Sequence, residues 1–325
     1  MKLVRVTRES AIPLIGCIAF GVIDRGTDLL QIRPSSACNL NCAYCSTRSG
    51  DQEAHPVSYE VEKDYLVDYV KEVAKFKGEK VEANVDSVGE TMLYKDIIGL
   101  ISDLNSSKEV RFTSMQTNGC LISEEKLKKM EEAGMGRINL SINAVDASLA
   151  KKLSGIPNYD VDKIINLARM IANSKIELLL APVWIPGLND DEIPKLVRLA
   201  KELGCRIGIQ KYETYKHSRK VKGVRPATYW KFYTQLREME KEFDAKLVFS
   251  ARDFGIHRAK RLPLKFEKGE KASLEVKAKG WWKGQMIAVG KNRCVTVNDC
   301  TKGEGDLVNV RVLENKNNIY VAKQA

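Results

Sequence analysis

No run of eighteen apolar residues occurs in this sequence of 325 residues, which excludes a membrane-spanning helix. The N-terminal segment does not have the form of a signal peptide, because it is charged and its apolar stretch is interrupted by Pro13, Gly16 and Gly21. Internal repeats and low-complexity tracts are missing as well. We therefore expect a cytoplasmic protein in a reducing environment, where cysteines are metal ligands or free thiols rather than disulfides.

Basic residues are concentrated in two segments rather than spread along the chain, whose formal net charge is +11. Residues 216–225 hold five basic residues and no acidic one, and residues 252–283 hold ten basic and four acidic residues. Lysines and arginines grouped in this way are typical of a surface that binds phosphates. The alternative is a solvated basic face without a partner.

Three of the eight cysteines lie within eight residues, in the stretch CNLNCAYC that begins at Cys38. Thiolates suit iron–sulfur clusters and zinc best, so Cys38, Cys42 and Cys45 predict a metal centre. Three ligands leave one iron of a four-iron cluster open to a substrate or cofactor, and we favour this interpretation. The alternative is a structural zinc site with His55 as the fourth ligand.

The other five cysteines have no tight ligand spacing; they are Cys17, Cys120, Cys205, Cys294 and Cys300. We expect them to be small buried residues. The alternative is that Cys17, Cys294 or Cys300 belongs to a second cluster or is a reactive thiol.

Short apolar segments alternate with longer amphipathic ones from residue 29 to residue 250. We expect strands over residues 29–33, 81–86, 110–116, 137–142, 176–183 and 206–210, with a last short strand over 247–250. We expect helices over residues 59–77, 95–104, 124–133 (with Ser123 as N-cap), 161–172, 190–203 and 228–243. Six βα units with apolar strands predict a partial (β/α)6 TIM-like barrel, an α/β fold whose site lies at the C-terminal ends of the strands.

Helical periodicity ends near Gly269. Short β-rich segments follow over residues 274–276, 286–289, 294–297, 307–313 and 319–322, with glycine or asparagine turns between them. They predict a small C-terminal all-β, OB-like barrel. We accordingly divide the chain into an N-terminal extension (1–24), the partial βα barrel (25–251), a basic linker (252–270) and the β-barrel (271–325).

With Tyr44 before its third cysteine, CNLNCAYC resembles the cluster motif of the radical S-adenosylmethionine superfamily. The resemblance implies that Cys38, Cys42 and Cys45 hold a [4Fe–4S] cluster, whose open iron binds the amino and carboxylate groups of S-adenosylmethionine. It also implies that one electron, delivered to the cluster by a donor, cleaves this cofactor to methionine and a 5′-deoxyadenosyl radical. That radical abstracts a hydrogen atom from the substrate.

Motifs at later strand ends are similar to those of the same family, over roughly residues 25–250. Ser87-Val-Gly-Glu90 stands where the family often has Gly-Gly-Glu, with Val88 in place of the first glycine, and a TNG turn begins at Thr117. PVWIPGLN, from Pro182, resembles the family's loop beside the adenosine. The resemblance implies cofactor contacts from Tyr44, Gly89, Glu90, Thr117, Asn118, Ser141, Asn143, Pro182 and Val183. Each motif alone also fits a plain structural role, such as a turn.

The C-terminal segment resembles a TRAM domain, a small β-barrel attached to several RNA-modifying enzymes. The likeness lies in Lys283-Gly284, the turn 289–292 and the stretch DLVNVRVLE from Asp306. It implies RNA contacts, with Trp281 and Trp282 stacked on bases or, alternatively, packed in the protein. The candidates are Lys216, Arg219, Lys220, Lys222, Arg225, Arg258, Lys260, Arg261, Lys279, Trp281, Trp282, Lys283 and Arg293.

Related methylthiotransferases carry a further N-terminal cluster domain. Because only 37 residues precede Cys38, we expect neither that domain nor a cobalamin-binding one. Substrate-side candidates, by position near strand ends, are Gln116, Lys211, Tyr212 and Arg252.

We therefore expect a radical S-adenosylmethionine enzyme that modifies a nucleobase in RNA, with transfer RNA favoured, by methylation or other C–H functionalisation. Its partners would be RNA and an electron donor, with no membrane and no DNA. The first alternative is a radical enzyme acting on a small metabolite, lipid or peptide, with the TRAM-like barrel as a lid or docking module. The second is a non-enzymatic, zinc-containing RNA-binding protein.

Overall fold

The computed structural model describes residues 1–325, which form two compact units. The first comprises Met1–Cys38, Gly50–Thr113 and Ile256–Ala325, and the second comprises Asn39–Ser49 and Ser114–Gly255. Strand β6 (Val110–Thr117) begins in the first unit and ends in the second. The domains predicted above are continuous stretches of sequence, whereas each of these units combines stretches that are far apart in the sequence. The predicted domain limits therefore stay a prediction.

A sheet in the first unit has the strand order β2-β3-β5, followed by the start of β6. Its strands are β2 (Gly21–Asp24), β3 (Leu29–Arg33) and β5 (Val81–Val85). β3 and β5 are parallel, and β2 is antiparallel to β3. Helix α1 (Lys63–Lys77) packs against α2 (Ile97–Ser106) and β2, and the short helix η1 (Thr91–Leu93) precedes α2. A separate parallel pair consists of β1 (Lys2–Val6) and β4 (Val57–Val61).

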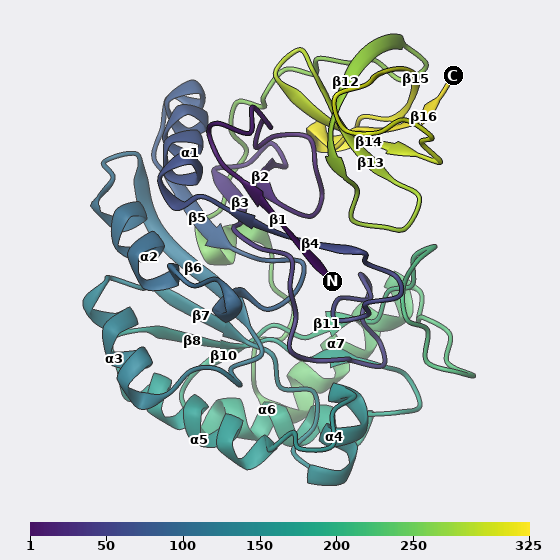
Figure 1. Ribbon diagram of the computed structural model, residues 1–325. Helices are drawn as coiled ribbons and strands as arrows, with labels where there is room; N and C mark the ends of the chain where they lie inside the picture. The colour runs from purple at the N-terminus through teal and green to yellow at the C-terminus, as the bar shows by residue number, and fades with distance from the viewer. The chain divides into compact units, whose positions relative to one another are not determined.

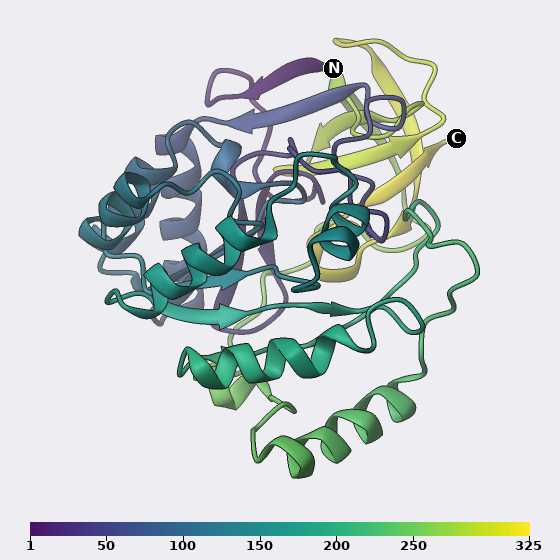
Figure 2. The ribbon, with the colours of Figure 1, turned by 90° about the horizontal axis from the view of Figure 1, so that it is seen from below.

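The second unit continues from β6 with β7 (Arg137–Leu140), β8 (Glu177–Leu180) and β10 (Arg206–Ile207), all parallel. Its helices are α3 (Glu124–Glu132), α4 (Ala147–Ser154), α5 (Val161–Ala172), α6 (Glu192–Glu202), α7 (Tyr229–Phe243) and the short η2 (Ala251–Phe254). A parallel pair, β9 (Val183–Trp184) and β11 (Gln210–Lys211), extends beyond β8 and β10. Helix α5 packs on β8 and α6 on β10 (Figure 1), and α7 lies along the outer side of α6 (Figure 2).

The six parallel strands expected from the sequence are present in order, within a TIM-like α/β arrangement. Strand register places Thr117, Leu140 and Leu180 in one row, so the loops after β6, β7 and β8 leave the same edge of the sheet. The predicted N-cap is also confirmed, because the hydroxyl of Ser123 accepts a hydrogen bond from the backbone N–H of Lys126. No helix has the length and apolarity required to cross a membrane.

Two predicted elements are wrong. The helix expected from residue 59 begins at Lys63, because residues 57–61 alternate as a strand and pair with β1. The strand expected over residues 247–250 does not form, because the backbone N–H groups of Leu247 and Val248 donate to the carboxylate of Glu240 instead of to a neighbouring strand. Helix α4 was not predicted at all.

The C-terminal segment forms the expected closed five-stranded barrel, drawn in green to yellow in Figure 1. Its strands are β12 (Lys271–Lys279), β13 (Met286–Gly290), β14 (Arg293–Asn298), β15 (Leu307–Glu314) and β16 (Val321–Gln324), with the short helix η3 (Lys316–Asn318) before β16. The barrel has its own apolar core, which includes Phe266, Val295 and Tyr320. Its OB-like character stays a prediction.

The barrel is joined to the N-terminal segment of the first unit by backbone hydrogen bonds. Cys294 N–H donates to the carbonyl of Ile15 at 2.8 Å, and Tyr320 N–H donates to the carbonyl of Gly16 at 3.0 Å. Gly16 has a φ of +126°, and a Cβ there would lie 2.0 Å from the carbonyl oxygen of Cys294. Only glycine therefore permits this close approach.

Candidate active site

The second unit holds the cysteine loop, residues 39–49, against the end of helix α4. The backbone N–H groups of Asn41 and Ala43 donate to the carbonyls of Ser154 and Leu153, each at 3.0 Å. Gly155 caps α4 with a φ of +70°, and a Cβ on it would lie 2.0 Å from the carbonyl oxygen of Asn41. The loop path is therefore fixed by a helix end that the sequence did not reveal.

Arg219 also holds this loop, which corrects its assignment to an RNA contact. Its guanidinium donates to the carbonyls of Cys42 at 3.1 Å and of Arg48 and Ser49 at 3.4 Å each. Its own backbone N–H donates to the carbonyl of Cys45 at 2.9 Å. A planar guanidinium has several diverging donors, so a single arginine can hold several carbonyls at once.

Asn143 connects the cysteine loop to the loop after β8. Its amide nitrogen donates to the hydroxyl of Tyr44 at 2.5 Å, and its amide oxygen accepts from Val183 N–H at 2.8 Å. The side chain of Asn189 in turn donates to the backbone carbonyls of Asn143 and Val183, at 2.9 Å each. Three residues predicted to contact the cofactor, Tyr44, Asn143 and Val183, thus lie together, and Asn189 was missed although it stands in PVWIPGLN.

The remaining predicted cofactor residues of this unit lie at the same strand edge. Asn118 donates through its amide to the side chain of Asn39 at 2.8 Å, which connects the TNG turn to the cysteine loop. The hydroxyl of Thr117 accepts from Gly119 N–H, so it supports the turn. Ser141 accepts from the side chain of Gln116, and Pro182 accepts from Gln210 N–H through its carbonyl.

In the first unit, Gly89 and Glu90 pack against the residue that precedes Cys38. Glu90 N–H donates to the carbonyl of Ala37 at 2.8 Å, and a Cβ on Gly89 would lie 2.0 Å from the same oxygen. The Glu90 side chain is buried, and its carboxylate accepts from Met92 N–H at the start of η1. Glycine is thus required at position 89, although Val88 departs from the family motif.

The donor set suits a multi-iron cluster. Nowhere do three Cys, His, Asp or Glu side chains converge as a single metal ion would require. Cys38, Cys42 and Cys45 supply three soft donors on one short loop, and in a cluster each thiolate binds a different iron. Burial, together with the nearby Cys45 thiol, raises the pKa of Cys42 to about 11, so metal binding there must release a proton.

His55 packs against Trp281 and belongs to no group of three Cys, His, Asp or Glu side chains that could hold a single metal ion, so the structure gives the zinc alternative no support. This buried side chain donates through Nδ1 to the carbonyl of Trp281 at 3.1 Å. Its ring stacks on that of Trp281, with centroids 4.1 Å apart and planes 16° apart. Trp281 is 3% exposed and therefore cannot stack on a base, so it is wrong as an RNA contact and the alternative of packing in the protein holds for it, while Trp282 is half-buried.

Arg293 is also wrong as a phosphate contact. Its guanidinium is buried, donating to the carbonyl of Asn292 at 2.8 Å and facing the side chain of Asn318. The other basic candidates are exposed: Lys216, Lys220, Lys222, Arg225, Arg258, Lys260, Arg261, Lys279 and Lys283.

Of the substrate-side candidates, Tyr212 is buried and accepts from Val221 N–H, and Lys211 pairs with Glu213.

Cys17 and Cys294 are buried thiols, as expected, whereas the expectation is wrong for Cys120, which is exposed, and Cys205 and Cys300 are only half-buried. Burial raises the pKa of Cys17 to about 11 and that of Cys294 well above its ordinary value. Cys294 donates to the carbonyl of Pro13 at 2.9 Å. Neither residue belongs to a group that could hold a metal.

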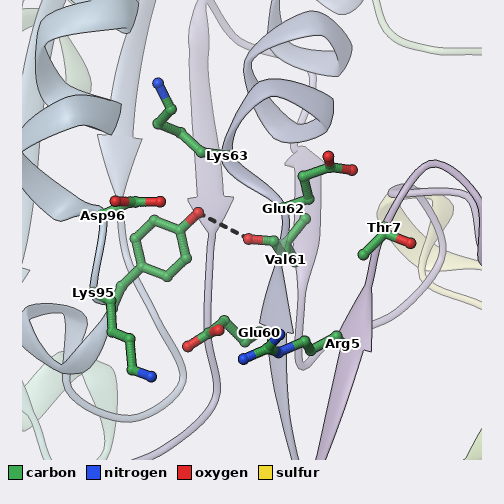
Figure 3. A pocket seen from close by; sticks show the side chains of 9 residues that line it. Arg5, Thr7, Glu60, Val61, Glu62, Lys63, Lys95 and Asp96 are labelled. Atoms are coloured by element: carbon green, nitrogen blue, oxygen red, sulfur yellow. Dashed lines mark hydrogen bonds between the residues drawn. The ribbon is translucent and has the colours of Figure 1, made fainter.

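A cavity of about 290 Å³ in the first unit lies between β1, β4 and the segment before α2 (Figure 3). Basic and acidic side chains alternate around it: Arg5, Lys63 and Lys95 against Glu60, Glu62 and Asp96. Because the two signs are balanced, this cavity has no preference for an anion.

The sequence is similar to those of several known proteins. The model of the radical SAM superfamily matches residues 32–200. An uncharacterized protein of Methanocaldococcus jannaschii is 37% identical over 340 residues, covering 96% of this chain and 78% of that protein. A probable GTP 3′,8-cyclase of Methanosarcina mazei is 31% identical over 190 residues, covering 57% of this chain and 54% of the cyclase. The chain thus matches about half the length of that cyclase.

Solved structures show a similar fold at low sequence identity. SuiB of Streptococcus suis bound to S-adenosylmethionine has a TM-score of 0.54 and 19% identity, covering 68% of this chain and 49% of that chain. TYW1 with a lysine–pyruvate adduct has a TM-score of 0.52 and 18% identity, covering 74% of this chain and 82% of that chain. At these identities the likeness concerns the fold alone.

Proposed function

The chain belongs to the radical S-adenosylmethionine superfamily, and we propose that it is an enzyme that modifies a nucleobase in RNA. Members of this superfamily use a [4Fe–4S] cluster and S-adenosylmethionine. Transfer RNA is the favoured substrate, and methylation or another C–H functionalisation is the reaction. A base must leave its stack to reach such a site, which is easiest in a loop.

We assign the cluster to Cys38, Cys42 and Cys45. When bound, the cluster and S-adenosylmethionine supply a carbon-centred radical able to abstract a hydrogen atom. The chain's own contribution is to fix the loop: Arg219 holds the carbonyl of Cys42, and α4 holds the backbone of Asn41 and Ala43. These contacts, with the bond from Arg219 N–H to the Cys45 carbonyl, fix the backbone that carries Cys42 and Cys45.

Cofactor contacts are assigned to polar groups around that loop. In the second unit, Asn143 orients Tyr44 and the Val183 backbone through its two amide atoms. In the first unit, the carboxylate of Glu90 can pair with an ammonium group, as its place in the SVGE motif suggests. The remaining cofactor contacts are assigned by position, to residues at or after the ends of strands: Gly89, Thr117, Asn118, Ser141 and Pro182.

The observation that carries the RNA assignment is the attachment of a basic segment to the cysteine loop. Ser218 donates through its hydroxyl to the carbonyl of Ser46 at 3.0 Å, and Arg219 N–H donates to the carbonyl of Cys45. The flanking Lys216 and Lys220 are exposed, as are Lys222 and Arg225 further along. A polyanion drawn to these cations is therefore brought to the side of the loop that holds Cys42 and Cys45.

A free nucleotide is the second candidate substrate. It is favoured by the 31% identity to a probable GTP 3′,8-cyclase, a protein named for a nucleotide substrate. A nucleotide also carries phosphates that the same cations would attract. An enzyme that modifies RNA turns over only when RNA is supplied, whereas an enzyme that acts on a free nucleotide turns over with that nucleotide alone. An assay with each substrate therefore distinguishes the two functions.

The decisive experiment reverses the exposed charge next to the loop. Anaerobic enzyme with reductant is assayed for cleavage of S-adenosylmethionine and, by nucleoside mass spectrometry, for change in transfer RNA from a deletion strain. We expect Lys216→Glu, Lys220→Glu and Lys222→Glu combined to weaken RNA binding by at least tenfold and to reduce its salt dependence.

The matched control is Lys128→Glu, Lys163→Glu and Lys175→Glu combined, which makes the same charge change at exposed positions of the second unit. It should leave affinity for RNA within about twofold, because net charge alone is a weak long-range effect at physiological salt. Equal loss of affinity in both triple variants, or turnover with GTP and none with RNA, would refute the RNA assignment.

A further inference from the structure

Helix α7 exposes large aromatic side chains where a surface helix normally has charged ones. Its buried face consists of Phe232, Leu236, Met239 and Phe243. On the opposite face, Tyr229 is 62% exposed and Trp230 is 78% exposed, with Tyr233 beside them. The later turns expose the charged residues Arg237, Glu238, Lys241 and Glu242. The exposed positions of the later turns show that charged residues suffice on this face of the helix, so burial does not explain the aromatic residues of the first turns. Exposed aromatic side chains gathered in this way mark an interaction surface.

Positively charged side chains lie on α7 and on the segment that precedes it, and two of them, Arg225 and Lys231, line a cavity at the start of the helix. Lys216, Lys220, Lys222, Arg225 and Lys231 are all exposed, and none of them has a carboxylate partner. The acidic groups in the vicinity are occupied: Glu213 pairs with Lys211 and accepts from the Tyr229 hydroxyl, and Asp190 accepts from the Trp184 indole. The surface is therefore aromatic and positively charged at once.

The segment that carries the cations is fixed to β11 and to the start of α7. Val221 N–H donates to the Tyr212 hydroxyl at 3.1 Å, and the Lys211 ammonium donates to the Ala227 carbonyl at 3.1 Å. The same ammonium lies 4.6 Å from the centre of the Tyr229 ring. These contacts hold the aromatic and basic groups in one arrangement within the second unit.

A cavity of about 440 Å³ opens at this surface, at the start of α7. Arg225, Thr228 and Lys231 lie along it, and Trp184 and Phe232 give it an apolar wall. Its size is that of a site for a small ligand. Unlike the balanced cavity in Figure 3, it includes two cations, Arg225 and Lys231, without carboxylate partners.

We propose that this α7 surface, formed by the exposed rings of Tyr229, Trp230 and Tyr233 and by the cations Lys216, Lys220, Lys222, Arg225 and Lys231, binds a single-stranded stretch of RNA. Bases stack on the aromatic rings, phosphates contact the cations, and one nucleotide occupies the cavity at Arg225 and Lys231. A single strand is required because paired bases do not expose their faces. This inference rests on the proposed RNA substrate and adds how the protein selects an unpaired region.

The test uses the full chain and a labelled single-stranded oligouridine, with fluorescence anisotropy measured over a range of salt concentrations. Trp230→Ala should weaken binding by about tenfold, the effect of losing one stacked base, without changing the salt dependence. Trp230→Phe should restore most of the affinity. Arg225→Ala and Lys231→Ala should instead reduce the slope of log K against log salt by about 0.7 for each phosphate contact.

The matched control for the exposed ring is Leu307→Ala, which removes a side chain of similar exposure from the C-terminal barrel. The control for the cations is Arg5→Ala with Lys95→Ala at the balanced cavity. Both controls should bind RNA as the unsubstituted chain does. A duplex of the same length should bind more weakly than the single strand.

The outcomes separate the two proposals. If the unsubstituted chain shows no salt-dependent binding of RNA, the proposed function fails. If it binds RNA and the lysine reversal weakens binding while Trp230→Ala does not, only the α7 surface is refuted. Binding to vesicles of phosphatidylcholine and phosphatidylserine that Trp230→Ala abolishes, with RNA binding unaffected, would assign the surface to a membrane instead.

Discussion

Asn143 connects two loops of the second unit's site through one side chain. It donates to Tyr44 and accepts from Val183, so it fixes the position of the cysteine loop and of the loop after β8. Asn143→Ala should lower the free energy of unfolding by about 1–2 kcal/mol, since two hydrogen bonds are lost at a half-buried position. Affinity for S-adenosylmethionine, measured by calorimetry on the reconstituted enzyme, should fall by about tenfold.

Asn143→Asp is the control for this prediction. A carboxylate accepts from Val183 N–H as the amide does, and the Tyr44 hydroxyl can donate to it, so both contacts survive. Cofactor affinity should remain within about threefold of that of the unsubstituted enzyme. Unchanged affinity and stability in Asn143→Ala would show that Asn143 has no positioning role.

Single residues were predictable where a local motif defines them. The spacing of CNLNCAYC indicates a metal loop, and Asn143 follows a predicted strand. Arg219 was misassigned because its partners lie about 170 positions earlier, and no local pattern separates a cation bound to backbone carbonyls from a free one in a basic run. Trp281 was left open for the same reason, and only the structure reveals its stacking on His55, 226 positions away.

At the scale of elements, the end of α4 determines the path of the cysteine loop. Gly155→Ala would place a Cβ 2.0 Å from the Asn41 carbonyl, at a position that also has a φ of +70°. We expect the loop to shift, and iron content after anaerobic reconstitution to fall from about four per chain to less than half of that.

Gly204→Ala is the matched variant. Gly204 follows α6 with a φ of +62°, and nothing lies within 4 Å of a Cβ built there. Its free energy of unfolding should fall by roughly 1 kcal/mol, as for any alanine forced into the left-handed region. It should nevertheless bind a full complement of iron. Equal iron in the two variants would contradict a role for the close contact at Gly155.

Amphipathic helices were the elements that the sequence predicted best, since α5 has the expected bounds and α7 begins one residue after its expected start and ends where expected. Short strands were predicted less well. The stretch at 57–61 has apolar residues that also fit the helix that follows, and its pairing with β1 depends on residues 55 positions earlier. Helix α4 has only eight residues, too few for a clear period.

At the scale of the whole molecule, residues 271–325 complete the first unit. Removing them deletes the partners of Pro13, Ile15 and Gly16 and the ring that stacks on His55. The shortened chain should lose hydrogen-exchange protection over residues 12–20 and 54–59, while the strands β7 and β8 keep theirs.

Leu307→Ala, on the exposed side of the barrel, should leave exchange in those regions unchanged. Protection retained over residues 12–20 after the deletion would show that the barrel is not required there. The deletion is consequently a poor test of RNA binding, and substitutions at exposed positions are the informative ones.

The contact between Cys294 and Pro13 also has a consequence for synthesis. The two residues are 281 positions apart, so the ribosome must translate nearly the whole chain before they meet. The second unit contains Cys42, Cys45 and Arg219, all of which emerge earlier. A chain that stalls before residue 294 therefore leaves the segment around Pro13 uncovered, and such a nascent chain is a natural client for chaperones.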